Sequence, residues 1–255
     1  MRIALYQTSS PAGDISAGLE TLDTALRAAA AAGVGMLVLP ELFLPGYNAV
    51  TKDPPPDWDG VYPGLKAMCR SHGVAMTIGL PEYDGLNVYN SAYVIGADGA
   101  DLARYRKVQL FGPRENAIFT PGDQLVVFDY QGIRFGLMIC YDVEFPEHTR
   151  ALTRAGAKVI LTPTANMMPF VTVADIQVPG RALENGVTIV YANYCESEGD
   201  LTYVGDSLIC GPDGYPLGRM GKKAGLLSVD LPKGQMPSGL PLSTQLRDYR
   251  PAKEP

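Results

Sequence analysis

Three residues whose types can act together on a carbonyl group stand where strand-like runs end. Cys140 follows an apolar run at residues 133–139. Glu41 follows a shorter run at residues 36–39, and Lys107 closes a predicted hairpin. Parallel strands present their carboxyl ends at one edge of a sheet, where α/β proteins commonly place their chemistry. The pattern therefore predicts a cysteine nucleophile served by a carboxylate and an ammonium group.

The elements that must position these residues alternate between strand-like and helical patterns. Strands are predicted at residues 2–7, 36–39, 74–80, 89–95, 102–105, 125–128, 133–139, 159–162, 188–192, 207–210 and 225–230. Helices are predicted from Asp14 or Ser16 to Gly33 and at residues 64–72, 147–155 and 173–184, with a loop at 108–123. Their alternation, without a break in composition, predicts one α/β domain over residues 1–255. A Pro-containing tail at 232–255 is expected to lie along a surface, where it could pack on a partner subunit.

The composition of the chain limits the kinds of partner and cofactor that are expected to bind. The chain has 21 basic and 27 acidic residues without a Lys/Arg cluster, which argues against nucleic acid or an anionic membrane as a partner. No apolar run approaches the roughly 18 residues of a membrane span, and no signal-peptide pattern is present, so a cytoplasmic protein is expected. The four cysteines lack metal-type pairing and there are two histidines, so reduced thiols and no metal or other cofactor are predicted.

Three short blocks resemble, in the same order, the motifs of the nitrilase or carbon–nitrogen hydrolase superfamily. The blocks are Pro40–Leu42, Arg106–Phe111 and Ile139–Asp142. Glu115, eight positions beyond Lys107, is similar to the extra glutamate that many members carry. Segments at 1–7, 45–48, 140–147, 163–167 and 190–195 look most like those of small aliphatic amidases and 5-aminopentanamidases.

This resemblance implies a fold, a set of catalytic residues and an assembly. The fold is an αββα four-layer sandwich. The catalytic residues are Glu41, Lys107 and Cys140, with Glu115 as an acceptor for Lys107 or for the substrate nitrogen. The implied activity is hydrolysis of small aliphatic carboxamides, with ω-amino amides among the candidates, by a homodimer or higher homo-oligomer.

The chemistry explains why these residue types are needed. A thiol is mostly protonated near neutral pH, so a base must take its proton, and a shielded carboxylate such as Glu41 can do so. The Lys107 ammonium and the backbone N–H of Tyr141 are expected to stabilise the negative charge that develops on the carbonyl oxygen. Glu41 would return its proton to the departing ammonia and then activate the water that cleaves the thioester on Cys140.

The residues expected to bind substrate are Tyr47, Tyr141, Glu144, Phe145 and Asn166. Asn166 is favoured because it is polar at a strand end, whereas the apolar run at 167–170 could be either a substrate wall or core. Five loop acids could face the pocket mouth and favour a cationic substrate: Asp142, Glu144, Glu196, Glu198 and Asp200. Asp142 and Glu144 could instead pair with Arg150 or Arg154 on the following helix.

Each catalytic candidate also has a purely structural interpretation. In isolation, Glu41 could cap a turn, Lys107 could be a solvated hairpin end, Glu115 could be an ordinary loop acid, and Cys140 could be a packing residue. His148 follows Cys140 by eight positions in a helical stretch and is expected to point away, which disfavours a cysteine–histidine mechanism. Nitrile hydrolysis, N-carbamoyl amino acid cleavage and a catalytically silent binding protein remain the alternatives, whereas no Gly-x-Ser-x-Gly elbow supports a serine hydrolase.

Overall fold

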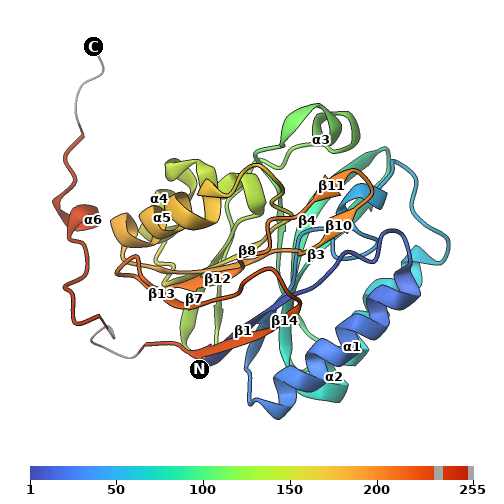
Figure 1. The fold of residues 1–255 in the computed structure, drawn as a ribbon, viewed down its shortest axis with the longest axis horizontal. Coiled ribbons are helices and arrows are strands. Elements are labelled where there is room, and N and C mark those ends of the chain that lie inside the picture. Colours follow the sequence, from blue (N-terminus) through green and yellow to red (C-terminus); the bar gives the residue numbers. More distant parts are fainter. Residues whose placement is uncertain (233–237, 252–255) are drawn as a thin grey trace.

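Two six-stranded sheets pack face to face between two layers of helices in the computed structural model, which describes residues 1–232 and 238–251 (Figure 1). The first sheet contains β1 (Arg2–Gln7), β2 (Met36–Val38), β3 (Ala75–Asp84), β4 (Asn87–Ile95), β5 (Asp101–Arg106) and β14 (Gly225–Asp230). The second contains β6 (Val127–Tyr130), β7 (Ile133–Leu137), β8 (Val159–Pro163), β9 (Thr188–Ala192), β12 (Leu208–Cys210) and β13 (Pro216–Arg219). The predicted αββα sandwich is confirmed.

The helices form the two outer layers. The α1 (Ile15–Ala31) and α2 (Trp58–His72) helices lie on the first sheet, and α4 (Pro146–Arg154) and α5 (Val178–Asn185) lie on the second. Asp14 caps α1 as expected, because its side chain accepts a hydrogen bond from the backbone N–H of Ala17 at 2.9 Å. Among the described residues no helix is long and apolar enough to cross a membrane.

Alternation along the central strands divides the core into three layers. On β1, Ile3 and Leu5 pack between the sheets, whereas Ala4 faces α1 and α2. On β9, Val190 packs between the sheets and Ile189 packs beneath α4 and α5. Each central strand is therefore apolar on both faces, which explains the continuous apolar runs in the sequence.

Both sheets have a parallel centre with antiparallel edges. The β1, β2 and β3 strands are parallel to one another, as are β7, β8 and β9. The predicted antiparallel pairing of residues 89–95 and 102–105 is confirmed in β4 and β5. Each parallel centre presents its carboxyl ends at one edge, and the catalytic candidates follow β2, β5 and β7.

Several predicted boundaries were wrong. The α2 helix begins at Trp58, six residues before the predicted start, because Pro63 is accommodated inside the helix. The predicted loop 108–123 contains α3 (Gly112–Ile118), a short helix with Pro113 in its first turn. Residues 173–184 begin as a π-helical turn at Val173–Gln177 before α5. The short strands β10 (Ser197–Glu198), β11 (Leu201–Thr202) and β13 were not predicted.

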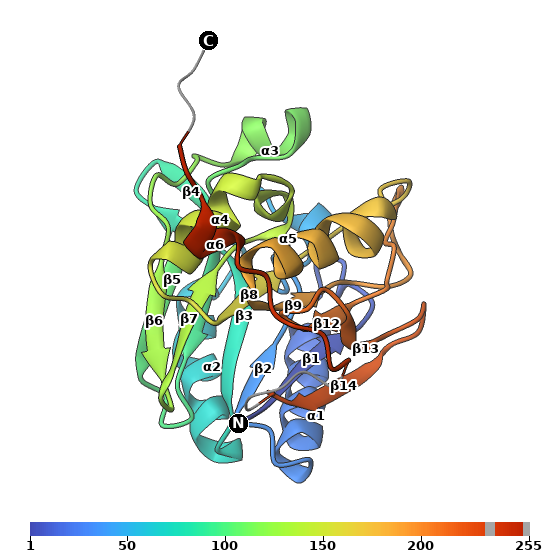
Figure 2. The ribbon, with the colours of Figure 1, turned by 90° about the vertical axis from the view of Figure 1, so that its left-hand side faces the viewer.

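The described part of the tail runs beside the α4 and α5 layer (Figure 2). It contains α6 (Gln245–Asp248), which contacts α5, and Tyr249, whose ring lies 4.8 Å from the guanidinium carbon of Arg154 on α4. Residues 233–237 and 252–255 of the predicted tail lie outside the described residues. Packing of the tail on a partner subunit stays a prediction.

Candidate active site

Loops that follow the parallel strands of the two sheets meet at one edge of the sandwich. The backbone N–H of Glu41, after β2, donates to the carbonyl of Thr164, after β8, at 3.3 Å. The N–H of Cys195, after β9, donates to the carbonyl of Thr8, after β1, at 2.9 Å. These bonds join the strand ends of both sheets, so residues from distant parts of the sequence converge there.

Glu41, Lys107 and Glu115 form a buried cluster at this edge. The Lys107 ammonium donates to Oε1 of Glu41 at 2.7 Å and to Oε1 of Glu115 at 2.8 Å. None of the three residues is measurably exposed to solvent. The geometry therefore brings together the three charged residues that the sequence predicted, with Lys107 between the two carboxylates.

Burial shapes the proton affinities in this cluster. Burial raises the pKa of Glu41 above its ordinary value, although the nearby Lys107 ammonium opposes the shift. Burial opposes the charge on Lys107, but the carboxylates of Glu115 and Glu41 outweigh it and raise the lysine pKa well above its ordinary value. Lys107 therefore stays an ammonium, and Glu41 holds a proton more readily than an exposed glutamate.

Cys140 lies at the turn that leaves the β7 strand. Its φ of +44° is in the left-handed region, which costs a residue with a β-carbon about 1–3 kcal/mol and is often found at functional sites. The residue begins a 3₁₀ turn at Cys140–Glu144, and its side chain lines a small cavity. The surrounding structure must hold this conformation in place.

Asp142 supplies much of that support. Its carboxylate accepts hydrogen bonds from the backbone N–H of Ile139 and of Gln109, each at 2.9 Å, and from the Tyr105 hydroxyl at 2.7 Å. Ile139 precedes the nucleophile and Gln109 follows Lys107 by two positions, so one buried carboxylate ties the two loops together. The expectations that Asp142 faces the pocket mouth or pairs with Arg150 or Arg154 were wrong.

The thiol of Cys140 is held in its protonated form. Burial and the negative charge of Glu41 raise its pKa, while the charge of Lys107 and hydrogen bonds from Thr164 and from the backbone of Ala165 oppose the shift. A thiol with a raised pKa needs a base before it can attack a carbonyl. Glu41 is a charged neighbour whose Oε2 atom is buried and has no hydrogen-bond partner among the described residues.

The cavity above Cys140 is small and largely apolar. Its volume is about 20 Å³, and its walls are formed by Tyr47, Phe111, Cys140, Tyr141, Glu144, Ala165, Asn166, Met167 and Phe170. The Phe111 ring packs edge-on against Tyr141 and Phe170, with ring centres 5.2 and 5.5 Å apart. These rings narrow the opening, so a long acyl group would have to pass the aromatic rim.

The predicted substrate-binding residues are only partly free to meet a ligand. Tyr47 lines the cavity, but its hydroxyl is donated to Glu115 at 2.7 Å. Asn166 also lines it and donates its amide to the carbonyl of Phe170 at 2.9 Å, which holds the following loop. Tyr141 lines the cavity. Phe145 does not line it and packs edge-on against the Tyr141 ring, with the two ring centres 5.0 Å apart.

The five loop acids do not gather into one binding site for a cationic substrate group. Glu198 accepts hydrogen bonds from the Asn48 backbone and the Tyr203 hydroxyl, and Asp200 accepts one from the Asn48 side chain. Of the five predicted acids, Glu144 is the one that lines the cavity among the described residues. Burial raises the pKa of Glu144, with the Arg181 charge and a hydrogen bond from Gln177 opposing the shift.

His148 and the loop at 167–170 are also placed. The Nε2 atom of His148 lies 3.1 Å from the side-chain nitrogen of Gln109, which disfavours the rival pairing with Cys140. Met167 and Phe170 line the cavity, whereas Met168 is about half exposed. The geometry thus favours a substrate wall over core for this loop.

Sequence reasoning missed Asn90, a buried residue of β4. Its side-chain amide donates to Oε1 of Glu41 at 2.7 Å. A polar amide inside the strand-like run at 89–95 was the available signal.

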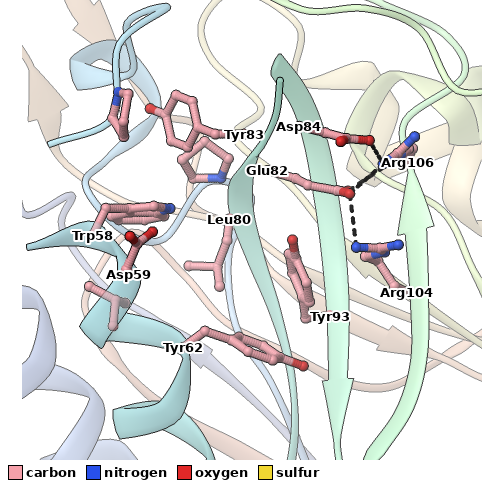
Figure 3. Close-up of a pocket in the computed structure, with 13 residues that line it drawn as sticks. Trp58, Asp59, Tyr62, Leu80, Glu82, Tyr83, Asp84, Tyr93, Arg104 and Arg106 are labelled. Carbon is pink, nitrogen blue, oxygen red and sulfur yellow. Dashed lines mark hydrogen bonds and ion pairs between the residues drawn. The ribbon is translucent and has the colours of Figure 1, made fainter. Parts of the chain in front are cut away.

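A larger hollow of about 470 Å³ lies between α2 and the outer face of the first sheet (Figure 3). Aromatic residues including Trp58 and Tyr93 line it, and Glu82 on β3 reaches across to Arg104 and Arg106 on β5. The carboxylate is thereby matched by two guanidinium groups. Because none of the predicted catalytic residues lines this hollow, the smaller cavity at Cys140 is the candidate active site.

Comparisons with known proteins agree with this geometry. The carbon-nitrogen hydrolase family model matches residues 2–238. An (R)-stereoselective amidase from Pseudomonas sp. is 31% identical over 98% of this chain and 92% of its own length. A hydrolase from the pqqF 5′ region of Pseudomonas protegens is 38% identical over 98% of this chain and 90% of its own.

A solved glutamate-to-glutamine mutant of the amidase from Nesterenkonia sp. AN1 is 38% identical, with a TM-score of 0.88 over 98% of this chain and 94% of that one. That structure carries the acetamide moiety of fluoroacetamide on its active-site cysteine. The resemblance inferred from three sequence blocks is confirmed across nearly the whole chain: this protein belongs to the carbon–nitrogen hydrolase family of the nitrilase superfamily.

Proposed function

We propose that this amide-hydrolysing enzyme acts on small aliphatic carboxamides, releasing the carboxylic acid and ammonia through a thioester on Cys140. The observation that carries the proposal is the buried Glu41–Lys107–Glu115 cluster, in which the charges of Glu41 and Lys107 act on the thiol of Cys140, which lines a cavity of about 20 Å³. Family membership and the amidases among the relatives support the same chemistry.

The first half-reaction forms the thioester. The Cys140 proton passes to Oε2 of Glu41, and the sulfur attacks the carbonyl carbon. The negative charge on the carbonyl oxygen is stabilised by the Lys107 ammonium and the backbone N–H of Tyr141. When this intermediate collapses, the carbon–nitrogen bond breaks, Glu41 gives its proton to the nitrogen, and ammonia leaves.

The second half-reaction restores the enzyme. Glu41 takes a proton from a water molecule whose oxygen attacks the thioester carbonyl. The carbon–sulfur bond then breaks, the acid is released, and the proton returns to Cys140. One carboxylate serves both steps, which requires Glu41 to exchange protons readily, and its raised pKa supports that requirement.

The lining of the cavity favours a substrate with a short acyl group. Met167 and Phe170 supply apolar walls, and the rings of Phe111 and Tyr141 narrow the opening. Short aliphatic amides would bury their methyl or ethyl groups there, whereas branched or aromatic acyl groups would require the rim to move.

A preference for ω-amino amides rests on Glu144. Its carboxylate lines the cavity and could pair with a substrate ammonium that extends along the apolar wall. The test compares kcat/KM for 5-aminopentanamide and pentanamide at low and high salt, in wild type and in Glu144→Gln. A preference for the amino amide that is lost in the variant supports the idea. Equal values in wild type would leave a plain aliphatic amidase.

A panel of amides, nitriles and N-carbamoyl amino acids, with ammonia release as the readout, tests the reaction itself. Short amides should be cleaved fastest, and mass spectrometry of quenched enzyme should find the acyl group on Cys140. Cys140→Ala should fold normally and be inactive. Faster turnover of nitriles or carbamoyl compounds would overturn the amide assignment. An unreactive Cys140 and no turnover would indicate a binding protein.

A further inference from the structure

Asn90 contacts both members of the central ion pair. It lies on β4 with about 1% of its surface exposed. Its side-chain nitrogen donates to Oε1 of Glu41 at 2.7 Å, and its backbone carbonyl accepts from the Lys107 N–H at 2.8 Å. A single strand residue thus holds the carboxylate directly and the lysine through its main chain.

These contacts make the two oxygens of Glu41 unequal. Oε1 accepts from both Asn90 and Lys107, each at 2.7 Å. Oε2 is buried and accepts no hydrogen bond from the described residues. Because a carboxylate is planar, two donors on one oxygen also fix the direction in which the other oxygen points. Oε2 is therefore the atom left free for proton transfer.

We propose that Asn90 is a positioning residue that directs Oε2 of Glu41 toward the thiol of Cys140 and keeps the carboxylate ready to accept its proton. This inference rests on the proposed role of Glu41 as the base. Asn90 is not among the residues that line the cavity, so it acts through Glu41 and not on the substrate.

The alternative is that Asn90 only satisfies a buried polar group. The two roles differ in their pH dependence. A hydrogen bond donated to a carboxylate stabilises its charged form and lowers its pKa, so loss of the Asn90 amide should raise the pKa of Glu41 further. A purely structural role would lower stability without moving the pH profile of the thiol.

The experiment compares Asn90→Leu, which keeps the approximate size, and Asn90→Asp, which keeps the shape, with wild type. Asn87→Ala is the matched control, because Asn87 is an exposed asparagine of the same strand. The readout is the rate at which iodoacetamide alkylates Cys140 across the acid range, with acetamide hydrolysis measured in parallel. Circular dichroism and thermal unfolding check the fold of each variant.

We expect both Asn90 variants to be alkylated at least about tenfold more slowly below neutral pH, since general-base assistance contributes roughly 10²–10⁴-fold. The midpoint of their acid limb should move to higher pH, while Asn87→Ala matches wild type. The shift is also expected for Asn90→Asp, because two adjacent carboxylates share a proton at higher pH than one.

An unchanged midpoint in the folded Asn90→Asp variant would overturn the inference, as would loss of the fold in both variants, which would assign Asn90 to folding alone. The proposed function can be separated from this result with Glu41→Gln. If Glu41→Gln is inactive while the Asn90 variants behave as wild type, only the role of Asn90 fails. If Glu41→Gln is fully active, the base assignment itself fails.

Discussion

The Lys107 ammonium lies 2.7 Å from Oε1 of Glu41, and both side chains are completely buried. With Glu115 on its other side, Lys107 is shared by two carboxylates at the edge where the two sheets meet. A cluster with two negative groups and one positive group is costly to bury unless each charge has a partner. The protein maintains it beside a thiol, which is the arrangement that acyl transfer needs.

The ion pair should be indispensable for turnover. Glu41→Gln removes the base and should lower kcat by roughly 10²–10⁴-fold. Lys107→Ala removes the charge that stabilises the oxyanion and should cost about 10²–10³-fold. Lys107→Arg should not restore activity, because a planar guanidinium delivers its charge in a different geometry. Steady-state ammonia release measures all three, and near-normal kcat in any of them would show that the catalytic residues are misplaced.

Activity should fall on acidification at a higher pH than an ordinary glutamate would cause. The base works only when it is ionised, and burial raises the pKa of Glu41 above the usual 4.5. The value of kcat/KM should therefore decrease as the pH falls through this raised pKa. The pH dependence of kcat/KM for short amides measures this pKa. A decrease centred at or below the ordinary glutamate pKa would contradict the effect of burial.

Glu115 should support catalysis by holding the lysine. Its second oxygen accepts a hydrogen bond from the Phe111 N–H at 2.8 Å. Glu115→Gln removes the negative charge and also turns an amide N–H, which is a donor, toward a group that itself donates. We expect kcat to fall by roughly tenfold or more. Tyr47→Phe removes a single hydrogen bond to Glu115 and leaves its carboxylate, so its smaller effect serves as the comparison. A larger loss in Tyr47→Phe would point to direct substrate binding by Tyr47.

Asp142 should matter for stability as well as activity. Three donors meet the Asp142 carboxylate. In Asp142→Asn at least one of them faces an amide N–H and loses its acceptor, which should destabilise the fold by roughly 1–3 kcal/mol. Urea unfolding measures this change. Asp129→Asn is the control, because it alters an exposed pair with Arg134 and should have little effect. Equal midpoints for the two variants would remove the argument that Asp142 ties the loops together.

We also predict a homodimer through the α4 and α5 layer. Ile176 lies in the π-helical turn that leads into α5, Leu183 lies on α5, and the two residues are 65% and 45% exposed. Neighbouring exposed apolar groups favour contact with another chain. Leu183→Glu should shift sedimentation toward the monomer, whereas Leu86→Glu on the distant β3–β4 turn should not. A monomeric wild type at micromolar concentration would contradict the prediction.

The sequence was sufficient for features set by local patterns. Apolar runs predicted the central strands, since residues such as Val190 and Ile189 must face two buried layers. The positions of Glu41 and Cys140 after such runs predicted that they would meet, because parallel strands bring their ends to one edge. Lys107 reaches the same edge because it ends the hairpin strand β5, which runs in the same direction as β3. Asp14 capped its helix as its residue type suggested. Short elements such as α3 and β13 were not predicted, because they contain too few residues to show a helical or strand period in hydrophobicity.

Only the tertiary structure decided which polar groups act on one another. Glu144 and Asp142 are two positions apart, yet one lines the cavity and the other is buried under three donors. Asn90 lies 49 positions from Glu41 and still holds its carboxylate. Such contacts depend on strand register and on how the two sheets face each other. Residue spacing along the chain carries no direct information about them, because each partner is brought into range by the packing of elements far apart in sequence.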